Sequence, residues 1–565
     1  MTSSGATLPL RNIASHLADM ARLQPERPAV ICAQGRDARG EVAYAQLSFG
    51  ELEAASNRLA LGLEGIGIGR GVRTALMVPP SPEFFILSFA LFKAGAVPVL
   101  IDPGIGIRHL KACLAHAQPE AFIGIAKAHM ARAVLGWARE SLRTHVFVGG
   151  NGSRMLARLW GGHTFDELLH RHGNAASHTA AEPVPGETAA ILFTSGGTGT
   201  PKGAEYTHEI FGAQVAHIRA LYGIEPGERD LATFPLFALF CPALGMTAVI
   251  PEMDASRPAT VDPRHIVSAI EKFSITNMFG SPALINRVGR HGEANHVKLP
   301  TLRRVISAGA PMPARVLARF VAMLSPGVQV FTPYGATECL PVASIGSDEV
   351  LGETAPHTEE GAGVCIGRPV AGLEVKVIRI TDEPIAEWDA ALELPAGQTG
   401  EIIVRAAHAT RRYFNLPEAT ALAKIPDPAS GGFYHRMGDV GYIDARGRLW
   451  FCGRKAHRVE TARGTRFSIP CEGVFNRSPR VFRTALVGVR RSGAMQPVLC
   501  VELEASARRD GRDGILAELR DLGSRHDITR DIDTFLFHPS FPVDVRHNAK
   551  IFRDRLALWA ERKLS

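Results

Sequence analysis

The sequence has few cysteines and none of the spacings that pair them. Its eight cysteines include no C-x-x-C pair, and no two of them are closer than 19 positions. This pattern excludes a zinc framework of paired cysteines and a small scaffold stapled by disulfides. We expect free thiols in a cytoplasmic protein, because disulfides persist mainly in oxidising compartments.

Uninterrupted hydrophobic runs of membrane-spanning length are also lacking. Leu231–Ile250 is uncharged, but two prolines and a glycine interrupt it and favour a strand, a turn and the start of a buried helix. Phe84–Ile101 has Lys93 at its centre, and a charge there is costly in lipid. The N-terminus lacks the architecture of a signal peptide. We therefore expect no transmembrane span and a cytoplasmic location.

Internal repeats and low-complexity segments are absent, and a chain of 565 residues allows about three to five compact units. The net charge of +7 is unevenly placed. Arg454–Ser565 holds 22 Lys and Arg and 14 Asp and Glu, a net +8, which leaves −1 for the rest of the chain. A basic surplus can indicate nucleic-acid binding, but acidic residues are mixed among these bases, as in Asp510–Asp513. We therefore expect no nucleic-acid partner.

Short apolar runs that alternate with helical stretches predict an α/β fold. Such runs indicate buried parallel strands of a doubly wound sheet; they are Thr74–Val78, Val97–Ile101, Ala121–Ile125 and His145–Val148. A second block of this kind covers about 189–345, after a linker at about 169–185. Short alternating strands at about 364–450 indicate a small β-barrel-like subdomain. Mixed strands and helices follow Arg454.

The strongest motif is Ile191–Gly203, which reads I-L-F-T-S-G-G-T-G-T-P-K-G. An apolar strand enters a loop rich in glycine and hydroxyl residues, with which backbone N–H groups and one cation can surround a phosphate chain. The loop is not a Walker A motif, because Pro201 precedes Lys202 and Gly203 follows it. Gly65–Gly71 is a poor dinucleotide fingerprint, because it joins an apparent helix to a strand.

This loop closely resembles the phosphate loop of the adenylate-forming superfamily, which includes acyl-CoA synthetases, peptide-synthetase adenylation domains and firefly luciferase. Gly197 stands where the family usually has a hydroxyl residue. Further motifs resemble the family in its order along almost the whole chain: Leu47–Leu52, Leu91–Pro98, Ser307–Pro311, Phe331–Glu338, Gly397–Ile402, Met437–Tyr442, Gly453–Arg454 and Asn548–Ile551. The resemblance implies a large N-terminal domain, residues 1–453, with two doubly wound sheets and the β subdomain, followed by a small mobile α+β lid domain, residues 454–565.

The resemblance also implies ATP and Mg²⁺ as cofactors and gives roles to single residues. Lys550, Glu338 and Thr198 are the implied catalytic residues, and Glu338 also holds the metal. Tyr334 is expected against adenine, and Asp439 and Arg454 near the ribose. The implied nucleotide-binding residues are Thr194, Ser195, Gly196, Gly197, Thr198, Gly199, Lys202, Gly309, Ala310, Pro311, Tyr334, Gly335, Thr337, Asp439 and Arg454.

These residue types suit the reaction that the resemblance implies. A carboxylate that attacks the α-phosphorus of ATP builds up charge on a five-coordinate phosphorus. Magnesium on the carboxylate of Glu338, hydroxyls at positions 194, 198 and 337, and the mobile ammonium of Lys550 can neutralise that charge.

The chain departs from the family where a thiol would act. Ala456 replaces the usual acid or lysine of the hinge, Gly464 comes one position later than in acyl-CoA ligases, and Ala238 stands where many relatives have histidine. The segment before Lys550 lacks the common S-G-K. These variants most resemble the olefin-pathway branch, the β-lactone synthetases of long-chain β-hydroxy acids.

The resemblance to this branch leads to a hypothesis about the reaction. ATP activates the carboxylate as an acyl-adenylate, and the substrate's own β-hydroxyl closes a β-lactone and expels AMP. A tethered hydroxyl needs no thiol site, because its effective concentration is already high. His208 is a candidate base, with a structural role as the alternative. A medium- or long-chain acyl-CoA synthetase is the alternative enzyme, and assembly with other olefin-pathway enzymes is a further expectation.

Overall fold

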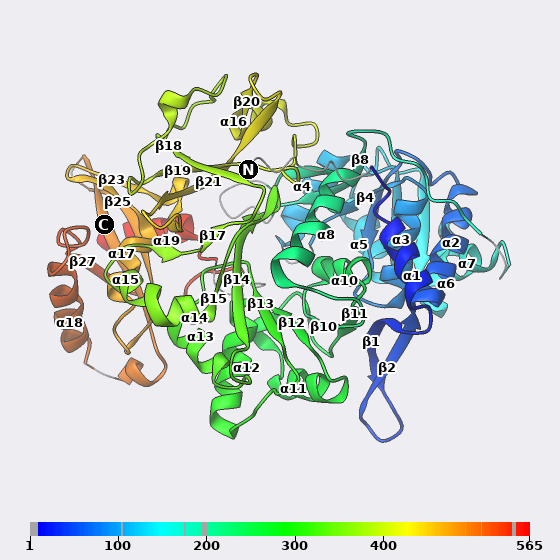
Figure 1. Ribbon diagram of the computed structural model, residues 1–565, viewed down its shortest axis with the longest axis horizontal. Coiled ribbons are helices and arrows are strands. Elements are labelled where there is room, and N and C mark those ends of the chain that lie inside the picture. Colours follow the sequence, from blue (N-terminus) through cyan, green and yellow to red (C-terminus); the bar gives the residue numbers. More distant parts are fainter. Residues whose placement is uncertain are drawn as a thin grey trace.

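The computed structural model of the chain describes residues 10–102, 105–173, 177–194, 201–491, 493–509, 511–544 and 550–565. Two large sheets with their helices form the body of the molecule (Figure 1). An antiparallel β subdomain lies above them in this view, and the C-terminal region, orange to red, lies at the left. The predicted α/β class is confirmed.

The first sheet, at the right of Figure 1, has the strand order β7-β6-β5-β3-β4-β8-β9, and its described strands pair in parallel except for β8 with β9. Its strands are β3 (Arg73–Met77), β4 (Val97–Leu100), β5 (Ala121–Ile125), β6 (Thr144–Val148), β7 (His163–Thr164), β8 (Thr188–Phe193) and β9 (Gly203–Thr207). The four apolar runs expected to be strands are β3 to β6, within a residue or two at their ends.

The second sheet has the order β17-β15-β14-β13-β12-β10-β11-β1-β2, with a parallel centre and antiparallel pairs at both ends. Its strands are β1 (Pro28–Arg36), β2 (Val42–Ser48), β10 (Arg229–Ala232), β11 (Thr247–Ile250), β12 (Asn277–Gly280), β13 (Arg304–Ser307), β14 (Gln329–Ala336), β15 (Cys339–Gly346) and β17 (Arg368–Pro369).

Helices cover both faces of the first sheet. On one face, α2 (Phe49–Glu64) packs against α3 (Pro82–Lys93) and α7 (Phe165–His170). The connection from β3 to β4 moves toward the β9 edge of the sheet, whereas the connections from β5 to β6 and from β6 to β7 move toward the β7 edge. Right-handed crossovers therefore put α5 (Ala126–Leu135) and α6 (Asn151–Trp160), which contact each other, on the other face.

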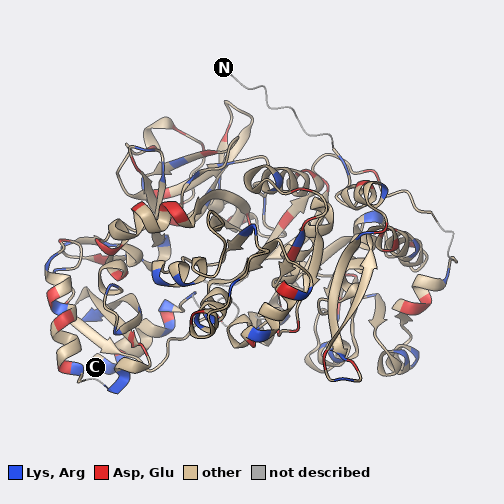
Figure 2. Cartoon of the chain, turned by 60° about the horizontal axis from the view of Figure 1, so that its bottom comes forward, with Lys and Arg blue, Asp and Glu red and all other residues tan. Residues whose placement is uncertain are grey.

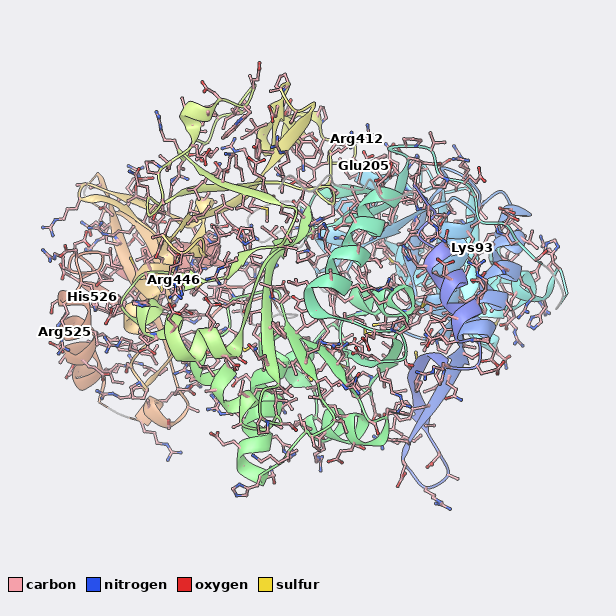
Figure 3. All side chains as sticks on the ribbon, viewed as in Figure 1. Lys93, Glu205, Arg412, Arg446, Arg525 and His526 are labelled. Carbon is pink, nitrogen blue, oxygen red and sulfur yellow. The ribbon has the colours of Figure 1, made fainter. Side chains whose placement is uncertain are left out.

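Lys93 at the end of α3 illustrates why its segment belongs to the core. The side chain of Lys93, which is labelled in Figure 3, is buried. Its Nζ lies 2.7 Å from Glu53 Oε2 and donates to Ser56 Oγ at 2.8 Å and to Asn57 Oδ1 at 2.6 Å, all on α2. A buried charge is tolerated when it is paired and hydrogen-bonded in this way.

The uncharged segment Leu231–Ile250 folds as a strand, two short helices and a second strand. After β10 come α9 (Pro235–Ala238) and α10 (Phe240–Leu244), and β11 follows. Gly245 ends α10 with a φ of +84°, and a Cβ there would lie 2.7 Å from Met20 Sδ, so glycine is required. Among the described residues, no helix combines the length and the apolar character needed to cross a bilayer.

The chain after β15 and β17 first builds an antiparallel sheet and then a separate C-terminal unit. The antiparallel sheet contains β16 (Val364–Cys365), β18 (Glu374–Ile378), β19 (Gly400–Arg405), β20 (Lys424–Asp427), β21 (Gly432–Ile443) and β22 (Leu449–Arg454). The C-terminal unit contains β23 (Val459–Thr461), β24 (Gly464–Arg466), α17 (Ser468–Phe475), β25 (Val481–Arg491), β26 (Ala494–Leu503), α18 (Arg512–Ser524), β27 (Thr534–Phe537) and α19 (Arg553–Leu564).

The C-terminal unit has apolar cores of its own. Both of its core clusters contain only residues that follow Arg454; the domain boundary at residues 453 and 454 stays a prediction. Its basic residues lie among acidic ones (Figure 2), and several are paired, as in Arg466 with Asp531 at 3.0 Å and Arg483 with Glu502 at 2.8 Å. These pairs hold part of the basic residues, and the net +8 of this region is the excess that remains over its acidic residues.

Candidate functional site

The phosphate-loop motif lies between two paired strands. Phe193 at the end of β8 faces Gly203 at the start of β9. Thr194 N donates to Lys202 O at 3.0 Å, and Lys202 N donates to Thr194 Oγ1 at 3.1 Å. These bonds hold the two ends of the loop together. The predicted residues Ser195, Gly196, Gly197, Thr198 and Gly199 lie outside the described residues.

The Y-G-A-T-E motif forms the tip of the β14–β15 hairpin. Ala336 pairs with Cys339, so Thr337 and Glu338 are the two residues of the turn. At Gly335 the register shifts, and a Cβ would lie 2.7 Å from both Cys339 O and Leu340 Cδ1. Only glycine fits there, and the irregularity aims the turn out of the regular ladder.

A segment that the sequence did not single out braces this turn. Tyr413 Oη donates to Glu338 Oε1 at 2.5 Å, and Thr410 N donates to Glu338 O at 2.8 Å. Tyr413 also pairs with Ala204 of β9, and Lys202 Nζ lies 5.0 Å from the centre of the tyrosine ring. The segment therefore joins the phosphate-loop strand to the Glu338 turn.

A second contact fastens the same segment to β9. Arg412 Nε lies 2.9 Å from Glu205 Oε2, and Figure 3 shows the two side chains next to each other. Glu205 N also donates to Arg412 O at 3.2 Å. No local sequence pattern links Tyr413 to Glu338, which is 75 positions away, so only the three-dimensional structure identifies this partner.

The predicted ribose residues lie on β21 and β22 of the β subdomain and meet Tyr334 of β14, which belongs to the second sheet. The β21–β22 register places Asp439 opposite Arg454. Tyr334 Oη donates to Asp439 Oδ2 at 2.7 Å, and Arg454 Nη1 lies 3.1 Å from Asp439 Oδ1. Burial raises the pKa of the Asp439 carboxyl, and the charges of Arg454 and Lys550 oppose this rise.

The geometry of this cluster fits a nucleotide. Asp439 Oδ1 is buried and, among the described residues, has no hydrogen-bond donor with suitable geometry, so it can accept from a ribose hydroxyl. Ser307 Oγ, at the end of β13, is likewise buried without a hydrogen-bond partner in the described part of the chain. Gly309 follows with a φ of +105°, which turns the chain away from the strand.

Lys550 enters the site from the C-terminal unit. Asp544 N donates to Lys550 O at 2.9 Å, and Val543 pairs with Ile551, so the two ends of this loop lie side by side. The rest of the predicted lysine motif, residues 545–549, lies outside the described residues.

A buried ion pair anchors the chain just after Lys550. Arg553, the first residue of α19, donates to both carboxylate oxygens of Glu472 on α17 at 2.6 and 2.7 Å. Glu472 also accepts from Leu486 N at 2.8 Å. Burial raises the pKa of Glu472, and the Arg553 charge opposes this rise. The pair fixes the lysine segment to the core of the C-terminal unit, a role that no sequence motif indicated.

Arginines on the body hold the C-terminal unit in place. Arg315 on α13 (Ala314–Val321) donates to Val481 O at 3.0 Å and to Phe482 O at 2.6 Å. Arg290 on α12 (Pro282–Asn295) lies 3.2 Å from Glu504. In this arrangement Lys550 is close enough to the predicted nucleotide-binding residues for its charge to act on Asp439.

One cavity of about 2030 Å³ is lined by residues of both the body and the C-terminal unit, and every predicted site residue that the structure describes lines it. These residues are Thr194, Lys202, Gly309, Ala310, Pro311, Tyr334, Gly335, Thr337, Glu338, Asp439, Arg454 and Lys550. Residues that are up to 356 positions apart, Thr194 and Lys550, thus meet at one site. Their individual roles stay predictions.

The cavity wall suits a magnesium ion that is shared with phosphates. The described residues contain no cluster of three or more His, Cys, Asp or Glu that could hold a metal on its own. Mg²⁺ is commonly bound by one or two carboxylates together with substrate phosphates. Glu338, whose side chain lines the cavity, provides one such carboxylate.

His208 lies outside this cavity and has a structural contact. It begins α8 (His208–Tyr222), it is 5% exposed, and its Nδ1 accepts from Ile13 N at 3.1 Å. Burial lowers its pKa to about 4. The structural alternative for His208 is therefore favoured over a role as base.

Comparison with known proteins defines the class. Residues 17–414 match the model of the AMP-binding enzyme family, and the chain belongs to that family. It is therefore an adenylate-forming enzyme, as the motifs predict. Among solved structures, the amide bond synthetase of Marinactinospora thermotolerans has the same fold, with a TM-score of 0.77 at 23% identity over 98% of this chain and 100% of that one.

Two relatives are similar over their full length. The chain is 50% identical over 564 residues to a protein of Xanthomonas campestris pv. campestris named olefin beta-lactone synthetase, covering 99% of each chain. It is 51% identical over 559 residues to a protein of the same name from Stenotrophomonas maltophilia, covering 98% of each. A feruloyl-CoA synthase of an Amycolatopsis species is 27% identical over 481 residues. The resemblance to the β-lactone branch is thus confirmed, and the CoA ligases are distant relatives.

Proposed function

We propose that this enzyme uses ATP and Mg²⁺ to activate a long-chain β-hydroxy fatty acid as an acyl-adenylate. The β-hydroxyl then closes a β-lactone in olefin biosynthesis, with release of AMP and pyrophosphate. The observation that carries the proposal is the convergence of all twelve described nucleotide and catalytic candidates on one cavity. The full-length relatives named olefin beta-lactone synthetase support the second step.

In the proposed adenylation step, different residues of the cavity bind the ribose and neutralise the phosphates. Asp439 Oδ1 lies 3.1 Å from Arg454 Nη1 but receives no hydrogen bond of suitable geometry from the described residues, so it can accept from a ribose hydroxyl; the Tyr334 hydroxyl bonds the other oxygen of the same carboxylate. Lys202 and Lys550 both line the cavity, one from the body and one from the C-terminal unit, and can bring positive charge to the phosphates. Mg²⁺, when bound at Glu338, would neutralise further phosphate charge. The carboxylate oxygen of the substrate then bonds to the α-phosphorus as pyrophosphate leaves.

The second step needs little from the protein beyond exclusion of water. The β-hydroxyl oxygen bonds to the acyl carbon, the bond from that carbon to the AMP oxygen breaks, and the hydroxyl proton leaves to the AMP phosphate or to solvent. Because the nucleophile is tethered, no thiol tunnel is required. The hinge agrees with this view: Lys455 Nζ lies 3.2 Å from Glu401 Oε1 and donates to Thr381 O at 2.8 Å, so this residue is tied to the β subdomain.

The test is product analysis with purified full-length protein. It is incubated with ATP, Mg²⁺ and a β-hydroxy fatty acid, with and without coenzyme A, and products are identified by mass spectrometry. We expect a product lighter than the substrate by one water without the thiol. The matched fatty acid that lacks the hydroxyl should release pyrophosphate without forming lactone. A strict requirement for coenzyme A, with an acyl thioester as product, would establish the acyl-CoA synthetase instead.

We also propose a cytoplasmic location, supported by the eight cysteines, all of which are buried free thiols. Assembly with other olefin-pathway enzymes remains part of the proposal. Size-exclusion chromatography of the purified protein, alone and mixed with those enzymes, tests it.

A further inference from the structure

Two neighbouring helices at the edge of the first sheet expose an unusual number of large apolar side chains. Of the nine such side chains that are exposed among the described residues, four lie on α5 and α6. On α5 they are Met130, 47% exposed, and Val134, 84% exposed; on α6 they are Met155, 65% exposed, and Leu159, 72% exposed. We call these two helix surfaces the α5–α6 face.

The spacing of these residues shows that the exposed side chains lie along one face of each helix. Met130 and Val134 are four residues apart, and so are Met155 and Leu159, so each pair lies along one side of its helix. The opposite sides are buried, with His129 of α5 and Ala157 of α6 in the interior. A surface hollow runs along α6 and is lined by Asn151, Arg154, Met155, Arg158 and Leu159.

The charge of this face has a single sign. The sequences of α5 and α6 contain four Lys and Arg and no Asp or Glu, in a chain with 63 basic and 56 acidic residues. Lys127, Arg154 and Arg158 are exposed. Arg154 lies 3.0 Å from Asp166 of α7, whereas no ion pair involves Lys127 or Arg158 among the described residues.

We propose that the α5–α6 face docks on an anionic lipid surface. Helices that rest in a lipid headgroup layer combine protruding apolar side chains with Lys and Arg that meet the phosphates. Protein interfaces instead rely on aromatic anchors, and here Trp137 is buried and Trp160 half-buried. No residue of α5 or α6 lines the large cavity, so docking leaves the proposed active site open. The inference is independent of the proposed reaction.

The test is sedimentation of the full-length protein with vesicles. Vesicles of phosphatidylglycerol and phosphatidylcholine are compared with vesicles of phosphatidylcholine alone, at low and high salt. We expect binding to the anionic vesicles that weakens as salt rises. The double variant Lys127→Ala/Arg158→Ala should lower the partition coefficient about 30-fold, because each basic residue near such a surface contributes about fivefold. Val134→Ser/Leu159→Ser should lower it at least about tenfold.

A matched control uses exposed leucines elsewhere. Leu23→Ser on α1 (Ser15–Leu23) and Leu558→Ser on α19 remove side chains that are 63% and 60% exposed and should leave vesicle binding unchanged. Thermal unfolding checks that every variant is folded. The proposal is overturned if the wild type does not sediment with anionic vesicles. An acidic protein would then be the alternative partner of this face. The proposal is also overturned if binding persists in both double variants or falls equally in the controls.

Discussion

Tyr413 donates a hydrogen bond of 2.5 Å to the Glu338 carboxylate from a segment 75 positions further along the chain. The Lys202 ammonium lies over the same tyrosine ring, with its Nζ 5.0 Å from the ring centre. One aromatic side chain thus contacts both the predicted metal ligand and the lysine of the phosphate loop. We expect it to orient Glu338 rather than to react.

Tyr413→Phe should weaken the use of Mg²⁺. The variant keeps the ring and loses the hydroxyl, and a hydrogen bond to a charged acceptor is worth about 1.5–3 kcal/mol. Pyrophosphate release at limiting Mg²⁺ should therefore fall about tenfold or more, and saturation should need more Mg²⁺. Binding of Mn²⁺ with ATP, followed by calorimetry, should weaken in parallel.

Tyr222→Phe is the matched control for this experiment. It removes another buried hydroxyl, which lies 3.2 Å from Ser344 Oγ and does not line the cavity. Its Mg²⁺ dependence should match the wild type. Equal Mg²⁺ dependence in Tyr413→Phe and the wild type would show that the contact does not position the metal ligand.

Lys550→Ala should strongly slow adenylation and leave the fold intact. Its ammonium is expected to neutralise charge on the α-phosphorus. Pyrophosphate release measures the rate of adenylation, and circular dichroism checks the fold. The control is Lys563→Ala, which removes an exposed lysine of α19, the helix that follows Lys550. Near-normal release by Lys550→Ala would refute its assignment.

Asp439→Ala should raise the KM for ATP more than it lowers kcat. The substitution removes the acceptor offered to the ribose and leaves Arg454 without its carboxylate. Asp439→Asn keeps one oxygen acceptor and should have the smaller effect. If both variants bind ATP as the wild type does in calorimetry, Asp439 is not a nucleotide ligand.

His208→Gln separates a structural role from a catalytic one. Burial lowers the pKa of His208 from 6.5 to about 4. Between these pH values the unfolded chain binds a proton that the folded ring does not, so His208 makes the protein less stable as pH falls through this window. The advantage in thermal midpoint of the wild type over His208→Gln should therefore be largest near pH 7 and shrink toward pH 4.

The second readout of this variant is lactone formation. Its rate at pH 7 should stay within a few-fold of the wild type. Loss of lactone with normal pyrophosphate release and an unchanged thermal midpoint would make His208 the base after all.

Local sequence patterns predicted the strands, turns and helix ends that depend on neighbouring residues. The apolar runs of β3 to β6 became strands because each is too short and too β-branched or aromatic for a helix, and the glycine-rich turn at Gly65–Gly71 joins α2 to β3 as expected. Within Leu231–Ile250, Pro235 is the first residue of α9, and Gly245 ends α10. Family motifs then indicated which residues belong to one site.

Contacts between distant segments could not be predicted in the same way. Tyr413 and Glu338 meet because Tyr413 pairs with Ala204 of β9, and nothing near Tyr413 in the sequence states that pairing. Arg553 and Glu472 are 81 positions apart and become a pair only when α17 and α19 pack on β25. Residues that support a site through tertiary contacts carry no motif of their own.

The fate of the carboxylate oxygen atoms shows which group of the substrate ATP activates. A β-hydroxy fatty acid labelled with ¹⁸O in both carboxylate positions is converted with ATP, and the lactone and AMP are weighed by mass spectrometry. Activation of the carboxylate followed by attack of the β-hydroxyl predicts one ¹⁸O in AMP and one in the lactone. AMP without label and a lactone with two ¹⁸O atoms would show that the hydroxyl is the activated group and would contradict formation of an acyl-adenylate.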